Sequence, residues 1–147
     1  KEALKKKADA DKRLQRVKQQ VRLAMTPEGI RLDLVDDADF SMFRLGTTVL
    51  IEEAASLLRA VAETLGPEGG HLSIRGHTDS LPWRPGEPAN NWSLSAGRAE
   101  ATRQEMLRRG IAEDRFARIE GVAAREPLVQ DNPADARNRR ISILLMP

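Results

Sequence analysis

SIRGHTD, residues 73–79, contains the end of a strand and the start of a loop. Its first residues alternate as in a half-buried strand, and the chain then runs through His77, Thr78 and Asp79 into SLPWRPGEPANN, residues 80–91. The prolines and the glycine of that stretch predict a loop. Folding alone does not require an apolar strand to end on an acid beside a long loop, so this strand end is where we look for function.

The segments on either side predict the rest of the fold. Ile30, Leu32 and Leu34 alternate with polar residues after a turn at 26–29, which predicts a hairpin. Apolar residues at helical spacing predict a long helix from Leu50 to Leu65, ended by Gly66 and Pro67. The other elements expected are a strand at 71–76, a helix at 95–109, a strand at 115–122, a loop with one helical turn at 125–138 and a strand at 139–146.

This order predicts an α/β two-layer sandwich, with the helices packed on one face of a mixed sheet. Residues 1–20 lack Gly and Pro and are rich in helix formers, but their apolar stripe is thin, so we expect a charged helical linker there. The predicted division is therefore a linker at 1–20 and one domain at 21–147. Because the chain begins with Lys1 and not Met, we expect it to be part of a longer protein.

Composition excludes several classes of function. The 147 residues include no cysteine, so disulfides, thiolate metal sites and cysteine nucleophiles are absent, and no apolar run approaches the roughly 20 residues of a membrane span. Residues 1–22 hold nine Lys and Arg against three acids, whereas the other 125 hold fifteen Arg against nineteen acids. A folded part that is slightly acidic argues against a nucleic-acid partner.

Charged residues converge on one end of the predicted sheet. Asp79 follows its strand, Arg98 falls in the first turn of the helix expected from Ser95, and a cation there opposes the helix dipole. Such a cation beside free backbone N–H groups could bind an anion. Asp79 and Arg98 together could then hold a zwitterion, with Asp79 on its ammonium group and Arg98 on its carboxylate. The alternative is an internal ion pair between them that ties the loop to the helix.

Arg139 and Arg140 begin the last predicted strand and therefore point to opposite faces. Arg139 shares its parity with the apolar residues Ile141 and Ile143, so it is expected to point inward, where an arginine needs a partner. We predict that Arg139 bonds Asp79 or adds a donor for a ligand carboxylate. Arg140 is expected to face solvent or a partner subunit.

The histidines and tryptophans are predicted to be structural. His71 and His77 share a face, but six strand residues span about 20 Å, so they cannot bind one metal ion. No metal site or catalytic acid pair can be placed, and we expect neither a cofactor nor an enzyme activity. Trp83 and Trp92 could be stacking platforms for sugars, although packing of the long loop onto its domain is the interpretation that we favour.

Four motifs in order resemble the OmpA-like peptidoglycan-binding domain over roughly residues 20–147. They are GHTD at 76–79, LSAGRA at 94–99, GVAAREP at 121–127 and NRRISI at 138–143. Four motifs in the right order are far more specific than GHTD alone. The resemblance implies that Asp79 and Arg98 bind diaminopimelate of the peptidoglycan stem peptide, with Thr78 and Arg139 beside them.

Within that family, the chain resembles the MotB proteins of flagellar motor stators in its Met42–Gly46 segment and in NWSLS, residues 91–95. Thr47 is a departure, because these proteins often have Ser there. This resemblance implies a periplasmic, homodimeric cell-wall anchor with a MotA-like partner, held in the inner membrane by a transmembrane helix outside these residues. The alternatives are a type VI secretion anchor of the TssL type, a Pal-like lipoprotein and, from another class, a peptidoglycan-modifying enzyme.

Overall fold

A computed structural model describes residues 20–37, 40–81 and 90–147. The predicted linker at 1–20 lies outside these residues except for Gln20. No helix within the described ranges is long and apolar enough to cross a membrane. The elements are β1 (Val21–Thr26), β2 (Gly29–Val35), α3 (Glu52–Leu65), β3 (His71–His77), α4 (Asn91–Arg108), β4 (Phe116–Gly121) and β5 (Arg140–Met146), with short 3₁₀ helices η1 (Glu113–Arg115) and η2 (Ala136–Asn138).

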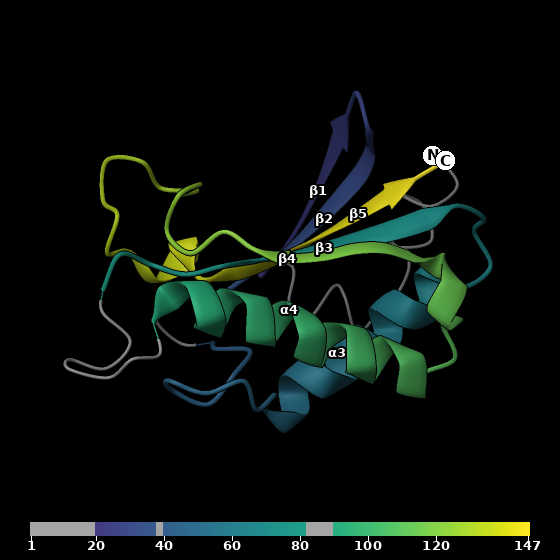
Figure 1. Ribbon diagram of the computed structural model, residues 1–147, viewed down its shortest axis with the longest axis horizontal. Coiled ribbons are helices and arrows are strands. Elements are labelled where there is room, and N and C mark those ends of the chain that lie inside the picture. Colours follow the sequence, from purple (N-terminus) through teal and green to yellow (C-terminus); the bar gives the residue numbers. More distant parts are fainter. Residues whose placement is uncertain (1–19, 38–39, 82–89) are drawn as a thin grey trace.

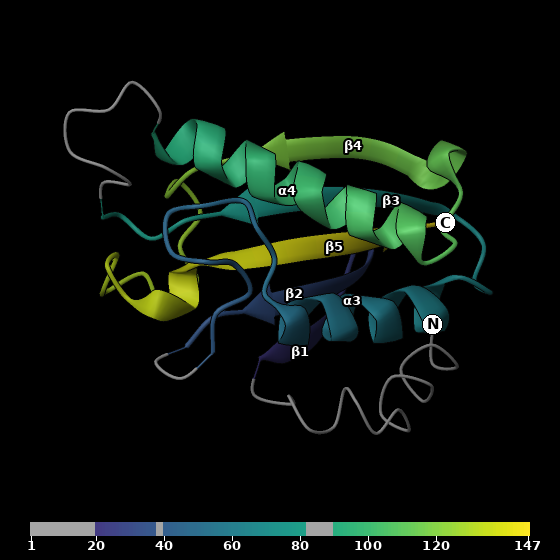
Figure 2. The ribbon, with the colours of Figure 1, turned by 90° about the horizontal axis from the view of Figure 1, so that it is seen from below.

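The strands form one mixed sheet in the order β1-β2-β5-β3-β4. β3 and β4 pair in parallel, and the other neighbours are antiparallel. Both helices lie on the same side of the sheet (Figure 1), with α4 along β3 and β4 and α3 beside it (Figure 2). This arrangement confirms the predicted two-layer α/β sandwich.

The core lies between the sheet and the helices. The alternating residues of β2 and β5 meet there in register, with Leu32 opposite Ile143 and Leu34 opposite Ile141. One face of α3 packs against them, and Leu58 and Val61 of that face are almost fully buried. The apolar residues recur every two positions in the strands and about every 3.6 positions in α3, and this spacing correctly predicted which side chains face the core.

The start of α4 differs from the prediction. The helix begins at Asn91, four residues before the expected Ser95, because Asn90 and Ser93 form a capping box. The Asn90 side chain accepts bonds from the backbone N–H groups of Trp92 and Ser93, and the Ser93 hydroxyl bonds the backbone N–H of Asn90. Arg98 therefore lies two turns into the helix, and the expectation that it opposes the dipole in the first turn is wrong.

Two glycines let α4 approach the sheet closely. A Cβ atom on Gly76 of β3 would lie 2.1 Å from the Ser95 carbonyl oxygen, and one on Gly121 of β4 would lie 2.3 Å from the Ala96 nitrogen. The Ser95 hydroxyl also accepts a bond from the Ala123 backbone N–H at 3.1 Å. This contact brings Arg98 of α4 to the end of β3, where Asp79 follows.

Candidate functional site

Asp79 is buried just beyond β3, with 6% of its surface exposed. Its Oδ2 accepts a bond from Arg139 Nη1 at 2.7 Å, and its Oδ1 accepts from the Leu81 backbone N–H at 3.0 Å. The segment around it is fixed by backbone bonds from Thr78 to Ala123 and from Ser80 to Pro133. The carboxylate is therefore held by the chain before any ligand binds.

Arg139 lies between two carboxylates. Its Nη1 donates to Asp79 and its Nε donates to Asp36 Oδ2 at 3.1 Å. Burial alone would lower the pKa of Arg139, but the bonds that it donates to Asp79 and Asp36, together with their negative charges, outweigh burial and raise that pKa. The predicted bond between Arg139 and Asp79 is thus present, and the inward orientation of Arg139 is confirmed.

Asp36 is the residue of this site that the sequence did not reveal. It follows β2 and is 3% exposed, and its carboxylate accepts bonds from the Met42 N–H and the Ser41 hydroxyl, both at 3.1 Å, as well as from Arg139. Burial raises the pKa of Asp36 despite the opposing effect of these bonds. The one available signal was an acid placed directly after a buried strand, as at Asp79.

Arg98 has a different environment. Its side chain is 6% exposed, its Nε donates to the Thr47 carbonyl at 2.8 Å, and its guanidinium carbon lies 4.8 Å from the centre of the Phe43 ring. Among residues 20–37, 40–81 and 90–147, no carboxylate lies within ion-pair distance of it. Burial lowers the pKa of Arg98, nearby Arg139 adds to that effect, and the charges of Asp36 and Asp79 oppose it without reversing it. The alternative of an internal pair between Asp79 and Arg98 is therefore wrong for this structure.

We call the space between these charges the clamp cleft, defined by Asp36, Asp79, Arg98 and Arg139. A cavity of about 10 Å³ is lined by Asp36, Arg98, Arg139 and Phe43 among others, whereas Asp79 is not among its lining residues and is linked to it through Arg139. That is about the space one water needs. Both acids form their ion pairs with Arg139, and among the described residues neither lies within ion-pair distance of Arg98, on which they act only at longer range. The arrangement suits an incoming carboxylate, with an acid close by for an ammonium group.

Thr78 lies beside the cleft in a supporting position. It is 3% exposed, and its hydroxyl bonds the Asp79 carbonyl at 2.8 Å. Its proposed contact with a ligand stays a prediction.

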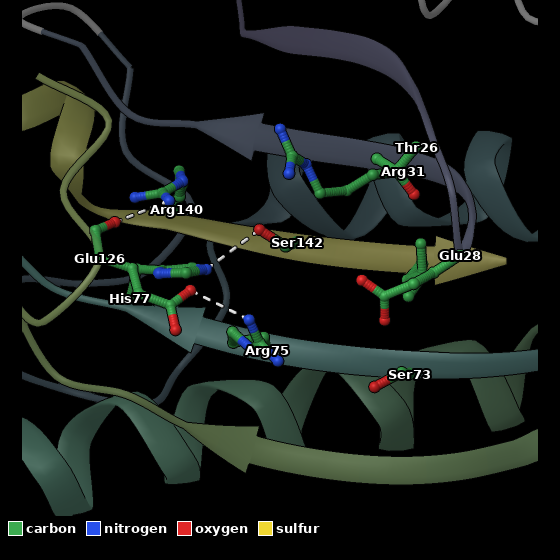
Figure 3. Close-up of a pocket in the computed structure, with 10 residues that line it drawn as sticks. Thr26, Glu28, Arg31, Ser73, Arg75, His77, Glu126, Arg140 and Ser142 are labelled. Atoms are coloured by element: carbon green, nitrogen blue, oxygen red, sulfur yellow. Dashed lines mark hydrogen bonds and ion pairs between the residues drawn. The ribbon is translucent and has the colours of Figure 1, made fainter. Parts of the chain in front are cut away.

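Arg140 was expected to face solvent, but its side chain is largely covered. It lies on the face away from the helices, but its side chain is only 10% exposed, because the loop around Glu126 covers it (Figure 3). Its Nη2 donates to the Glu126 carbonyl at 2.8 Å. The solvent-facing prediction is therefore wrong, and contact with a partner subunit is untested.

His77 shares this face with His71, as expected, and is itself buried at 3% exposure. Its Nε2 bonds the Ser142 hydroxyl at 3.0 Å. Burial, with the nearby guanidiniums of Arg140, Arg75 and Arg31, lowers the pKa of His77 to about 3. In the described part of the chain, no group of three or more acids and histidines is placed to hold a metal ion.

Of the two tryptophans, the structure describes Trp92. Trp92 is 49% exposed at the start of α4, so the prediction that it packs the loop onto the domain is wrong for this residue. It lies in the first turn of α4, where the earlier start of the helix places it on the outside. Trp83 falls outside the described residues.

Comparison with known proteins shows the family and the fold of the chain. A model of the OmpA family matches residues 42–140. Motility protein B of Escherichia coli K12 is 34% identical over 139 residues, which cover 94% of this chain and 45% of that relative. The chain thus spans less than half the length of this relative.

Two solved structures share the fold. The periplasmic domain of Helicobacter pylori MotB superimposes with a TM-score of 0.76 at 16% identity, covering 89% of this chain and 82% of that one. The cell wall anchor of the type VI secretion system from Pseudomonas aeruginosa gives 0.75 at 24% identity, with 88% and 90% covered. The motifs, the sheet order and these matches confirm the resemblance seen in the sequence, and the chain belongs to the OmpA family.

Proposed function

We propose that this chain is a non-catalytic peptidoglycan anchor of the MotB type, which binds diaminopimelate of the stem peptide in the clamp cleft. The observation that carries the proposal is Arg98, a buried guanidinium without a carboxylate partner among the described residues, next to the buried carboxylate of Asp79. A buried charge of this kind is costly unless it is paired. A ligand carboxylate supplies the missing partner.

The side-chain end of diaminopimelate carries one carboxylate and one ammonium group. In the proposed complex, the carboxylate binds Arg98, and Arg139 offers a further donor. The ammonium group binds Asp79, whose oxygens keep acceptor capacity beyond the bonds from Arg139 and Leu81. Because the cleft has room for about one water, the ligand must displace the side chains around it.

The larger setting is also a proposal. The identity of 34% with Motility protein B over most of this chain favours a flagellar stator, in which the domain is periplasmic and homodimeric and works with a MotA-like subunit. A linker at 1–20 would then join the domain at 21–147 to a transmembrane helix in the inner membrane. The structural likeness to a type VI secretion anchor supports a second setting for the same wall-binding chemistry.

The test compares two stem peptides that differ only at one side chain. One carries diaminopimelate and the other carries lysine, which keeps the ammonium group and lacks the carboxylate. Calorimetric titration of the parent protein should show the lysine peptide binding more weakly by about 2 kcal/mol or more, because Arg98 then stays buried without its anion. Arg98→Ala should bind both peptides weakly and nearly equally.

Asp79→Ala is the complementary variant, and it should lose affinity for both peptides because both carry the ammonium group. Arg59→Ala, which changes an exposed arginine of α3, is the matched control and should bind as the parent does. Equal affinity of the parent protein for the two peptides would show that Arg98 does not read the carboxylate.

A further inference from the structure

Asp36 faces the space that a ligand carboxylate would enter. Its side chain, together with Arg98 and Arg139, lines the cavity of about 10 Å³ in the clamp cleft, and Asp79 does not line it. A ligand carboxylate that binds Arg98 and takes a donor from Arg139 therefore comes to lie beside Asp36. The ammonium group of the same ligand lies on the side of Asp79, so it does not separate the ligand carboxylate from Asp36.

The carboxylate of Asp36 is fixed at this position by two separate parts of the chain. Its Oδ1 accepts a bond from the Met42 N–H at 3.1 Å, and its Oδ2 accepts from the Ser41 hydroxyl and from Arg139 Nε, both at 3.1 Å. Only 3% of the surface of Asp36 is exposed, so little water is present to screen its charge. We therefore expect Asp36 to stay at the cavity when a ligand enters.

Two carboxylates that share a buried site repel each other, and one of them then holds a proton far more readily than usual. Here that carboxyl is Asp36, because burial already raises its pKa in the protein without ligand. The ligand carboxylate, in contrast, gains Arg98, which has no carboxylate within ion-pair distance among the described residues. A charged ligand carboxylate beside a neutral Asp36 is therefore the favoured arrangement.

The other titratable groups around the cavity do not take this proton. Besides Asp36, those that line it are Arg98 of α4, His77 of β3, and Arg139 and Arg140 at the start of β5. The arginines already carry their charge. His77 has a pKa of about 3, so it is neutral above about pH 4.5. Asp37, the next acid along the chain, accepts a bond from the Phe40 N–H at 2.8 Å and does not line the cavity.

We propose that Asp36 is a further binding residue of the clamp cleft, which takes up one proton from solvent when the ligand carboxylate enters and donates a hydrogen bond to it. This inference rests on the proposed function and adds a residue and a proton to it. Protonation also weakens the attraction between Asp36 and Arg139, so the guanidinium of Arg139 turns its donors toward the ligand. The clamp cleft therefore binds a carboxylate more tightly as the pH falls.

The experiment titrates the whole chain with two stem peptides. One carries diaminopimelate, and in the other the side-chain carboxylate of diaminopimelate is an amide, which has nearly the same shape and no charge. In the parent protein, the preference for the carboxylate should fall about threefold or more between pH 5 and pH 7.5, and by at most about tenfold per pH unit, the limit for one proton. Calorimetry in buffers of different ionisation enthalpy should show proton uptake with the carboxylate peptide and none with the amide.

Asp36→Asn tests the residue directly. Asparagine has no proton to gain, and its side-chain oxygen can still accept the bond from the Met42 N–H. The preference of this variant for the carboxylate peptide should not change with pH, and its proton uptake should be lost. His77→Gln alters another residue that lines the same cavity and should keep the pH dependence of the parent protein. The reverse result for the two variants would overturn the proposal.

The parent protein alone separates this proposal from the proposed function, so the test does not depend on the folding of a variant. If the parent protein binds the diaminopimelate peptide with a preference that is the same at every pH and without proton uptake, the role of Asp36 is overturned and the clamp stands. If the parent protein does not prefer diaminopimelate over lysine at any pH, the proposed function itself is overturned.

Discussion

The guanidinium of Arg139 lies 2.7 Å from the carboxylate of Asp79, and this ion pair joins the start of β5 to the end of β3. The same guanidinium reaches Asp36 after β2 at 3.1 Å. One arginine thus ties together the ends of three neighbouring strands. This leaves Arg98 free of a carboxylate partner in the described structure, which is the property that the proposed function uses.

Arg139→Ala should therefore damage both stability and binding. It leaves the buried carboxylates of Asp36 and Asp79 without their cation, and breaking a buried pair from one side costs about 3–5 kcal/mol. The loss of stability should be smaller than this energy, because the Arg139 side chain is 27% exposed and solvent screens its charge. Urea unfolding and titration with the diaminopimelate peptide measure the two effects.

Arg140→Ala is the neighbouring comparison. Its guanidinium bonds the Glu126 carbonyl on the opposite face of the sheet, so the peptide affinity should stay near that of the parent protein. A larger loss of peptide binding in Arg140→Ala than in Arg139→Ala would reverse the assignment of the two arginines.

His77 should make the domain less stable in mild acid. Its pKa is about 3 in the folded protein and 6.5 ordinarily, so between these values the unfolded chain binds a proton that the folded chain does not. Stability is lost as the pH falls below about 6.5, and at pH 4.5 the loss reaches about 2–3 kcal/mol, since one pKa unit corresponds to about 1.4 kcal/mol.

The measurement is the free energy of unfolding at pH 7, 5.5 and 4.5 for the parent protein and for His77→Gln, which cannot titrate and can still donate to Ser142. The difference between the two proteins should shift in favour of the variant as the pH falls. A difference that does not change with pH would mean that His77 is readily protonated in the folded protein.

Asp36 should have the opposite pH dependence. Burial raises the pKa of its carboxyl above the ordinary 3.8, so the folded protein holds a proton that the unfolded chain releases. The contribution of Asp36 to stability is therefore present at low pH and is lost as the pH rises through its folded pKa. Melting temperatures of the parent protein relative to Asp36→Asn should decline as the pH rises above 4, and a relative rise would contradict the raised pKa.

Local patterns predicted the part of the site that depends on strand parity. The alternation of Ile141 and Ile143 placed Arg139 inward, and the strand end placed Asp79 beside it. Asp36 was missed because its bond to Arg139 spans 103 positions and depends on β2 pairing with β5, which the pattern did not specify. The environment of Arg98 was missed for a similar reason, since Thr47 and Phe43 reach it from an irregular segment.

The start of α4 shows a different limit. Asn90 and Ser93 form a capping box, but they follow a proline-rich stretch that is typical of a loop, so the pattern predicts the helix only from Ser95. The capping residues themselves were visible in the sequence. Because α4 begins at Asn91, Arg98 does not lie in the first helical turn and does not oppose the helix dipole. The argument for an anion site at Arg98 therefore rests on the burial of its guanidinium and on the lack of a carboxylate within ion-pair distance among the described residues.

The last prediction concerns the contact that positions Arg98. In Gly121→Ala, the added Cβ would lie 2.3 Å from the Ala96 nitrogen and 2.5 Å from the Ser95 hydroxyl, so α4 must move away from β4. Overpacking of this kind costs about 1–3 kcal/mol. Because Arg98 is carried by α4, the diaminopimelate peptide should also bind more weakly at a temperature where the variant is fully folded. The control is Gly69→Ala, whose new Cβ has no atom within 4 Å and should leave binding unchanged. If folded Gly121→Ala bound the peptide like the parent protein, close packing of α4 on the sheet would not be what places Arg98 in the clamp cleft.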